Sequence, residues 1–107
     1  MRKKVTSILV FASVILVLMS CQKKPVASFT VSTNTIEQNK PVVFTNTSTD
    51  AESYQWEFGD TTISFATSPY HRYDTTGTYT VRLTVFSYKG KFSDEATTTI
   101  KVTPPSN

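Results

Sequence analysis

The sequence predicts an all-β fold, an antiparallel β-sandwich of about seven short strands. Three observations lead to it. Apolar and polar residues alternate with a period of two from Pro25 onward, turn-forming residues interrupt this alternation repeatedly, and no segment of this part carries a helical stripe. Alternation of β-branched and aromatic residues with polar ones is typical of strands that bury one face.

Five alternating runs place the expected strands. Their inward-facing side chains are Ala27, Phe29 and Val31; Val42 and Phe44; Tyr54, Trp56 and Phe58; Tyr79, Val81, Leu83 and Val85; and Ala96, Thr98, Ile100 and Val102. The turn signals between them are Asn39-Lys40-Pro41, 48–52, Gly59-Asp60, Ser68-Pro69, 74–77 and Lys89-Gly90. A chain of this size buries only about 60 per cent of its unfolded surface, so the core is small. We expect much of it to come from Phe29, Phe44, Trp56, Phe58, Tyr79 and Leu83.

One local motif narrows the fold class. In immunoglobulin-like sandwiches, a tyrosine near the start of the sixth strand bonds back to upstream backbone, two residues before the second disulfide cysteine. In "DTTGTYTV" (74–81), Tyr79 fits the tyrosine position and Val81 takes the place of the cysteine. We therefore predict an immunoglobulin-like sandwich in which Val81 packs against Trp56 without a disulfide.

Several segments together resemble the PKD domain family. They are "PVASFTVS" (25–32), "PVVFTNTSTD" (41–50), "YQWEFGD" (54–60), "SPYHRYDTTGTYTVRLTV" (68–85) and "TTTIKV" (97–102), and they cover 25–103 in order. The resemblance implies an immunoglobulin-like sandwich that serves as a non-catalytic spacer or interaction module in cell-surface proteins, bacterial enzymes and lipoproteins. The structural motif expected from it comprises Trp56, Phe58, Gly59, Asp60, His71, Tyr73, Gly77 and Tyr79. Thr61 stands where the family usually has a second glycine, so this turn must form without glycine's permissive backbone.

Glu57 and Asp60 form the most obvious carboxylate pair in the sequence. On a strand, Glu57 points away from the face of Trp56, and Asp60 lies in the following turn, where a short carboxylate bonds nearby backbone amides. Paired acids of a glycosidase need a cleft between them and a raised pKa on one of them. No residue nearby indicates either feature, so we interpret Asp60 as structural and Glu57 as facing solvent.

His71 is the sole histidine. By alternation it shares a face with Pro69 and Tyr73, which favours a packed ring whose nitrogens bond the turns of the sandwich. A catalytic triad needs a nucleophile, an acid and an oxyanion donor around the histidine. No serine lies in a nucleophile-elbow context, so we expect no catalytic residue and no enzyme.

The sequence offers few ligands for a metal. Some PKD-like modules of bacterial collagenases bind calcium in the loop after the second strand, and calcium takes six to eight oxygen ligands, several of them from carboxylates. The corresponding loop at 48–52 supplies only Asp50 and Glu52. We expect no metal and no cofactor.

Aromatic residues outside the core alternation are candidates for binding a partner. They are Phe65, Tyr70, Phe86, Tyr88 and Phe92, and the run 86–92 predicts a hairpin that turns at Lys89-Gly90. We name Phe86, Tyr88 and Phe92 as candidate ligand contacts, because exposed rings stack on sugars or anchor proteins. The alternative is that these rings complete the edges of the small core.

Two turns contain candidate acceptors for O-glycosylation. Asp60-Thr61-Thr62 and Asp74-Thr75-Thr76 resemble the acceptor pattern of Bacteroidetes, which gives Thr61 and Thr75 as the candidate sites. Turn chemistry alone also explains both segments.

The N-terminal residues have the layout of a secretory signal, with Arg2, Lys3 and Lys4 followed by an uncharged run at 5–19. A membrane-spanning helix is the alternative, but it needs roughly 20 apolar residues and this run is shorter. "LMSC" (18–21) resembles the lipobox of bacterial lipoproteins, although its methionine is bulkier than usual. The resemblance implies that Cys21 becomes the acylated first residue of the mature protein. A plain secretory signal with an incidental cysteine is the other interpretation.

These predictions divide the chain into four parts: a helical lipoprotein signal peptide at 1–20, an acylated cysteine and short tether at 21–25, a sandwich at 26–103 and a disordered tail at 104–107. The signal holds three of the eleven Lys and Arg residues, which leaves eight in the mature chain against eight Asp and Glu residues. Because the mature chain has no excess of positive charge, we expect no nucleic-acid partner. Gln22 favours sorting to the outer membrane over the inner one.

We expect a monomeric, lipid-anchored, non-catalytic module of the bacterial cell envelope, possessing a protein or glycan partner. The alternative is a carbohydrate-recognition accessory protein that works beside polysaccharide-degrading enzymes.

Overall fold

The computed structural model describes residues 23–106, which form eight strands and one short 3-10 helix. The strands are β1 (Phe29–Val31), β2 (Thr35–Glu37), β3 (Pro41–Asn46), β4 (Ser53–Glu57), β5 (Ile63–Ser64), β6 (Tyr70–Arg72), β7 (Gly77–Phe86) and β8 (Ser93–Thr103), and the 3-10 helix is η1 (Tyr88–Gly90). The predictions for the signal peptide at 1–20 and for Cys21 fall outside these described residues. Within residues 23–106, no helix is long and apolar enough to cross a membrane.

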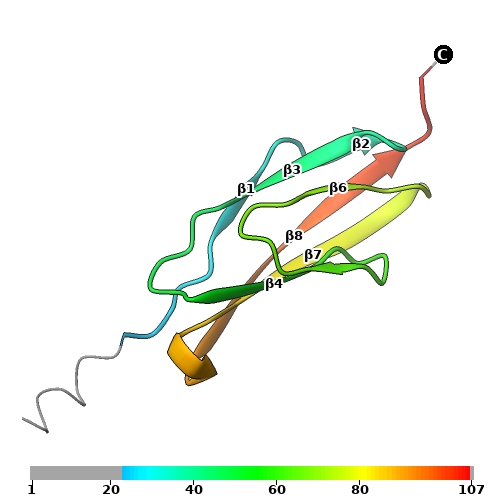
Figure 1. Ribbon diagram of the computed structural model, residues 1–107. Helices are drawn as coiled ribbons and strands as arrows, with labels where there is room; N and C mark the ends of the chain where they lie inside the picture. The colour runs from blue at the N-terminus through cyan, green and yellow to red at the C-terminus, as the bar shows by residue number, and fades with distance from the viewer. Residues whose placement is uncertain (1–22, 107) are drawn as a thin grey trace, which may run out of the picture.

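The strands form two sheets that pack as a sandwich (Figure 1). One sheet has the order β1-β3-β6, and the other has the order β2-β8-β7-β4-β5. The pairs are antiparallel apart from β2, which runs parallel to the end of β8 and pairs Ile36 with Val102. The prediction of an all-β, immunoglobulin-like sandwich is confirmed.

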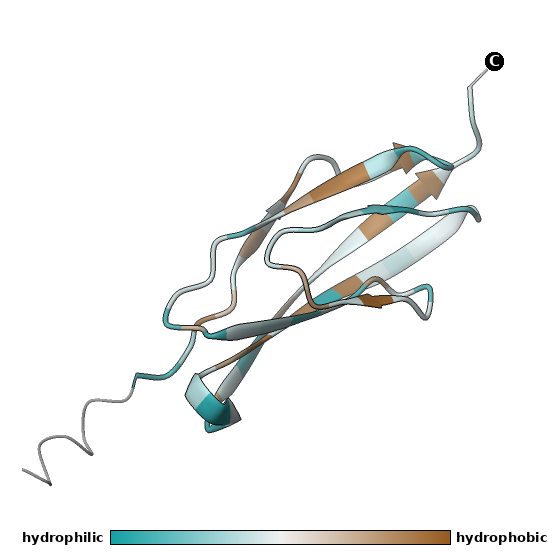
Figure 2. Cartoon of the chain, in the orientation of Figure 1, coloured by the Kyte–Doolittle hydropathy of each residue, from teal (hydrophilic) through white to brown (hydrophobic). Residues whose placement is uncertain are grey.

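The core follows the predicted alternation, and Figure 2 shows hydrophobic and hydrophilic residues interspersed along the strands. Its buried members are Val42, Phe44, Trp56, Phe58, Tyr73, Val81, Leu83, Val85, Ile100 and Val102. Trp56 and Val81 are both fully buried in this one cluster, which agrees with apolar packing in place of a disulfide. Phe29 and Tyr79, which we expected in the core, are partly buried at its margin.

Some elements differ from the expectation. The short strands β2, β5 and β6 lie outside the five alternating runs. The central strand of the larger sheet is β7 and not β4, which contains Trp56. The ten residues of β7 pair with both β4 and β8, whereas β4 lies next to the edge strand β5.

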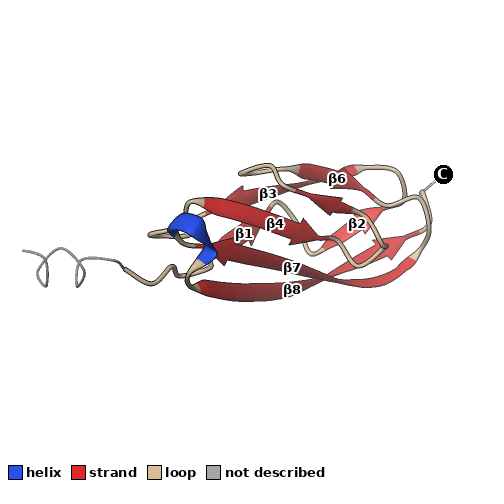
Figure 3. Cartoon of the chain, turned by 60° about the horizontal axis from the view of Figure 1, so that its bottom comes forward, coloured by secondary structure: helices blue, strands red, loops and turns tan. Residues whose placement is uncertain are grey.

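The two ends of the described chain lie at opposite poles of the sandwich (Figure 3). The chain enters beside η1, which connects β7 to β8 and confirms the predicted hairpin at 86–92. At the other pole, Ser106 donates its backbone amide to the Glu37 carboxylate over 3.0 Å, and this contact lowers the pKa of Glu37. This part of the predicted tail is therefore positioned by a contact with the sandwich.

Candidate functional site

The turn after β4 contains two residues with positive φ. Gly59 has a φ of 86°, and a Cβ atom added there would lie 2.7 Å from the carbonyl oxygen of Thr80. Thr61 has a φ of 75°, which β-branched residues rarely adopt. The turn thus forms without the family's second glycine, and Thr61 carries the backbone strain.

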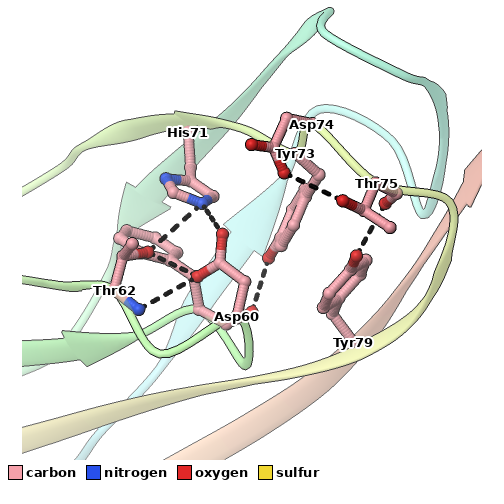
Figure 4. A network of polar contacts seen from close by, with 8 residues as sticks. Asp60, Thr62, His71, Tyr73, Asp74, Thr75 and Tyr79 are labelled. Atoms are coloured by element: carbon pink, nitrogen blue, oxygen red, sulfur yellow. Dashed lines mark hydrogen bonds and ion pairs between the residues drawn. The ribbon is translucent and has the colours of Figure 1, made fainter.

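Asp60 holds this turn together through its carboxylate (Figure 4). Its Oδ1 accepts a hydrogen bond from the backbone amide of Thr62 over 3.1 Å and another from the Thr62 hydroxyl. Its Oδ2 lies 2.7 Å from Nε2 of His71 on β6. Partial burial raises the pKa of Asp60, but the bonds from Thr62 and His71 outweigh it and the net pKa is lowered. Asp60 therefore joins the turn after β4 to the opposite sheet as a carboxylate.

His71 is packed, as the alternation predicted. Its ring stacks on Phe58 with centroids 4.1 Å apart and lies edge-on to Tyr73 at 4.7 Å. Tyr73 in turn donates a buried hydrogen bond to the carbonyl oxygen of Phe58 over 2.8 Å. Burial raises the pKa of Tyr73, and the nearby Asp60 adds to this, so the hydroxyl remains a donor. The histidine belongs to a structural network that connects the two sheets.

Glu57 does not join Asp60. Its carboxylate lies 3.4 Å from the guanidinium of Arg82 on the neighbouring strand β7, and that guanidinium also lies 3.9 Å from Glu95. These ion pairs are about half exposed, so they contribute little to stability. The two carboxylates have separate partners, and the arrangement provides no acid and base for hydrolysis.

The predicted tyrosine corner is present. The Tyr79 hydroxyl donates to the carbonyl oxygen of Thr75 over 2.6 Å, and its ring stacks on Tyr73 at 4.3 Å. Gly77 has a φ of 151°, a conformation that favours glycine. Thr61 and Thr75 are both exposed, and their glycosylation stays a prediction.

The aromatic residues of the hairpin are less accessible than predicted. Tyr88 is 63% exposed, but Phe86 and Phe92 are half-buried. The ammonium groups of Lys24 and Lys91 each lie 5.4 Å from the centre of the Phe92 ring. The backbone amide of Phe92 donates to Oγ of Ser87 over 2.8 Å, which draws this residue into the turn. Of the three candidate contacts, Tyr88 alone presents most of its surface.

A larger exposed apolar surface lies on β3 and β6. Tyr70 is 64% exposed and Val43 is 48% exposed, and these two residues pair across the strands. They line a shallow hollow of about 370 Å³ together with Pro41, Ser68, Pro69 and Arg72. The Arg72 guanidinium lies 5.6 Å from the centre of the Tyr70 ring. We call this region the β3–β6 surface.

Phe65 lies on the segment between β5 and β6, and it is 69% exposed. The prediction that Phe65 and Tyr70 are exposed is confirmed. The β3–β6 surface was not predicted from the sequence. One signal indicated it, because Tyr70 has the opposite parity to the inward-facing His71 and Tyr73 and therefore points outward.

Among residues 23–106, no group of three or more His, Cys, Asp or Glu side chains is placed to hold a metal ion. Asp50 lies in the loop considered for calcium, where its φ is 56° and its side chain is exposed.

The pattern of the PKD domain family matches residues 22–102. The chain belongs to the PKD domain family. This PKD domain is 43% identical to collagenase ColA of Bacillus cereus over 72 residues, which cover 62% of the chain and 8% of the collagenase. The chain therefore corresponds to a small part of that curated relative.

Two solved structures are similar over most of the PKD domain. The crystal structure of the PKD1 domain of Vibrio anguillarum Epp has a TM-score of 0.65 and 35% identity, and the match covers 78% of this chain and 99% of that one. A structure from a study of promiscuous specificity in carbohydrate-binding modules of the β-sandwich superfamily has a TM-score of 0.71 and 33% identity. The match covers 78% of this chain and 36% of the second structure.

Proposed function

We propose that this PKD domain is a non-catalytic interaction module of the bacterial cell envelope, anchored as a monomer by a lipid on Cys21 and sorted to the outer membrane. The observation that carries the binding role is the β3–β6 surface, where Tyr70 and Val43 are exposed side by side. The family membership supports a module of this kind. The anchor rests on the lipobox-like sequence "LMSC" at 18–21.

The β3–β6 surface suits a protein partner. Exposed aromatic rings beside a guanidinium are enriched at the energetic centres of protein interfaces, and Tyr70 with Arg72 supplies this combination. β6 is also the edge strand of its sheet, so its outer side is available for pairing with an extended segment. The surface therefore combines an apolar anchor with an accessible strand edge.

Carbohydrate recognition is the second candidate, and the shape of the same surface favours it. The Tyr70 ring borders a shallow, open hollow, and an exposed ring of this kind stacks on the apolar face of a sugar. The similarity to a structure from a study of carbohydrate-binding modules gives this candidate further support. Such a protein would hold polysaccharide near degrading enzymes.

One substitution tests both candidates. We expect Tyr70→Ser in the full chain to lose affinity capture of a partner from detergent-solubilised native envelopes, or retention on envelope polysaccharides. Tyr88→Ser is the matched control, because Tyr88 is equally exposed but lies on η1, and it should retain binding. Binding of proteins alone supports the first candidate and binding of glycans supports the second. Equal binding by both variants and the unaltered chain would exclude the β3–β6 surface.

A further inference from the structure

The structure gathers lysines and aromatic rings at the pole where the described chain begins. Lys23 and Lys24 enter there, and η1 with the following residues adds Tyr88, Lys89, Lys91 and Phe92. Figure 3 shows η1 beside the point of chain entry, at the opposite pole from the C-terminal end. We call these six residues the hairpin pole.

The tether and the hairpin touch each other at this pole. Lys24 and Lys91 approach the Phe92 ring from two different parts of the chain, each at 5.4 Å. Lys89 lies 5.6 Å from the centre of the Tyr88 ring. Contacts between ammonium groups and aromatic faces are favourable and place the charges beside the rings. The hairpin pole is therefore one surface and not two separate segments.

The backbone of the hairpin holds this surface in place. Ser87 and Phe92 close the turn, with the Ser87 amide donating to the Phe92 carbonyl oxygen over 2.9 Å. Gly90 donates its amide to the Ser87 carbonyl oxygen over 2.8 Å. Lys89, at the tip, has a φ of 56°. The cations and the exposed Tyr88 ring are thus presented at the end of a closed turn.

Positive charge is concentrated at the hairpin pole. The chain after residue 22 has eight Lys and Arg residues, and four of them are Lys23, Lys24, Lys89 and Lys91. Acidic groups lie beside it: Asp50 and Glu52 share a hollow with Lys23 and Tyr88, and Asp94 accepts a hydrogen bond from the Ala27 amide. These carboxylates offset part of the positive charge, since a hydrogen bond from a neutral amide leaves Asp94 charged, and the four lysines exceed the three carboxylates by one.

We infer that the hairpin pole rests on an anionic bilayer surface, so that the sandwich stands with its long axis away from the membrane. This inference rests on the lipid anchor of the proposed function. Lys23 follows Cys21 by two residues, and an extended chain spans about 3.5 Å per residue, so the backbone of Lys23 lies within about 7 Å of that of Cys21. Each lysine near an anionic surface contributes about 1 kcal/mol, and tyrosine rings favour the headgroup region.

The test uses two single-tryptophan additions. Tyr88→Trp and Tyr70→Trp are a matched pair, because the two tyrosines are 63% and 64% exposed but occupy different parts of the molecule. Trp56 is fully buried and gives the same background in both. The acylated full chain is reconstituted into vesicles that contain phosphatidylglycerol and brominated phosphatidylcholine. We expect the brominated lipid to quench most of the fluorescence of the added tryptophan in Tyr88→Trp. In Tyr70→Trp, we expect it to quench almost none of this fluorescence.

Charge is tested in the same vesicles. Lys89→Gln with Lys91→Gln should reduce the quenching at position 88 to the level seen in purely zwitterionic vesicles, and high salt should do the same because it screens these charges. Equal quenching in anionic and zwitterionic vesicles would overturn the electrostatic contact.

Acylation of Cys21 is measured separately, from the mass of the peptide that contains this residue. If Cys21 is acylated but position 88 is not quenched, or both positions are quenched equally, the inference fails and the anchor stands. If Cys21 carries no acyl group, the anchor fails and the inference fails with it.

Discussion

Thr61 is the residue at which this PKD domain departs most clearly from the usual motif, because its φ of 75° is strained for a β-branched side chain. We expect Thr61→Gly to raise the free energy of unfolding by about 1 kcal/mol, since glycine adopts this conformation without a steric clash. Urea denaturation followed by Trp56 fluorescence measures the change. Thr62→Gly is the control and should destabilise, because it removes the hydroxyl that bonds Asp60. A Thr61→Gly variant no more stable than the original would contradict the strain.

Asp60 makes stability depend on pH. Its pKa is lower in the folded protein than in the unfolded chain, so the unfolded chain binds the proton more readily in acid. This contribution to the free energy of unfolding is complete above the unfolded pKa of about 3.9 and is lost as pH falls through the folded pKa. We expect Asp60→Asn to be less stable than the original chain at pH 7. We also expect it to lose less stability between about pH 5 and pH 2, the range that surrounds the unfolded pKa of aspartate.

The control for this measurement is Asp50→Asn, which removes the same formal charge at an exposed position away from His71. It should preserve the acid-induced loss of stability. Denaturant titrations at a series of pH values distinguish the variants. If Asp60→Asn and Asp50→Asn have parallel pH profiles, the contact between Asp60 and His71 does not carry the effect.

At the scale of elements, two tyrosine hydroxyls donate hydrogen bonds to backbone carbonyl groups, and they differ in burial. Tyr73 after β6 donates to the Phe58 carbonyl oxygen inside the core, whereas Tyr79 on β7 donates to Thr75 near the surface. We expect Tyr73→Phe to cost about 1–3 kcal/mol because a buried carbonyl loses its partner, and Tyr79→Phe to cost about 0.5–1.5 kcal/mol. Thermal and urea unfolding measure both costs. A smaller cost for Tyr73→Phe than for Tyr79→Phe would refute this ranking.

The long strands were predictable because their own residues carry the signal. Val81, Leu83 and Val85 alternate with polar residues, and all three are fully buried in β7. β2 carries no such signal, because three residues form a strand only through parallel pairing with β8, and that partner is more than sixty residues away in the sequence. A strand fixed by a distant partner cannot be read from its own pattern.

The candidate site likewise has features that the local sequence predicts and contacts that depend on distant strands. The turn at Asp60 and the packing of His71 followed from residue type and parity, but their mutual contact depends on how the chain passes from β5 in one sheet to β6 in the other. The β3–β6 surface depends on Val43 and Tyr70 being paired across two strands, which no local pattern specifies.

At the scale of the whole molecule, the proposed lipid anchor on Cys21 would determine where the domain acts. We expect Cys21→Ala to abolish palmitate labelling and to move the protein from the membrane fraction to the soluble fraction, because two or more acyl chains are needed for stable attachment. Met19→Ala is the control: it brings "LMSC" closer to the usual lipobox and should keep the label. Persistent labelling of Cys21→Ala would exclude this cysteine as the anchor.

The parallel pairing of β2 with β8 has a mechanical consequence. The two ends of the described chain lie at opposite poles, so tension applied between residues 23 and 106 pulls β2 and β8 past each other along their length. The bonds from Gln38 to Thr103 and from Lys101 to Asn34 then carry the load together in shear and are not opened one at a time. A domain held at one end and pulled at the other would therefore load this pair of strands in shear.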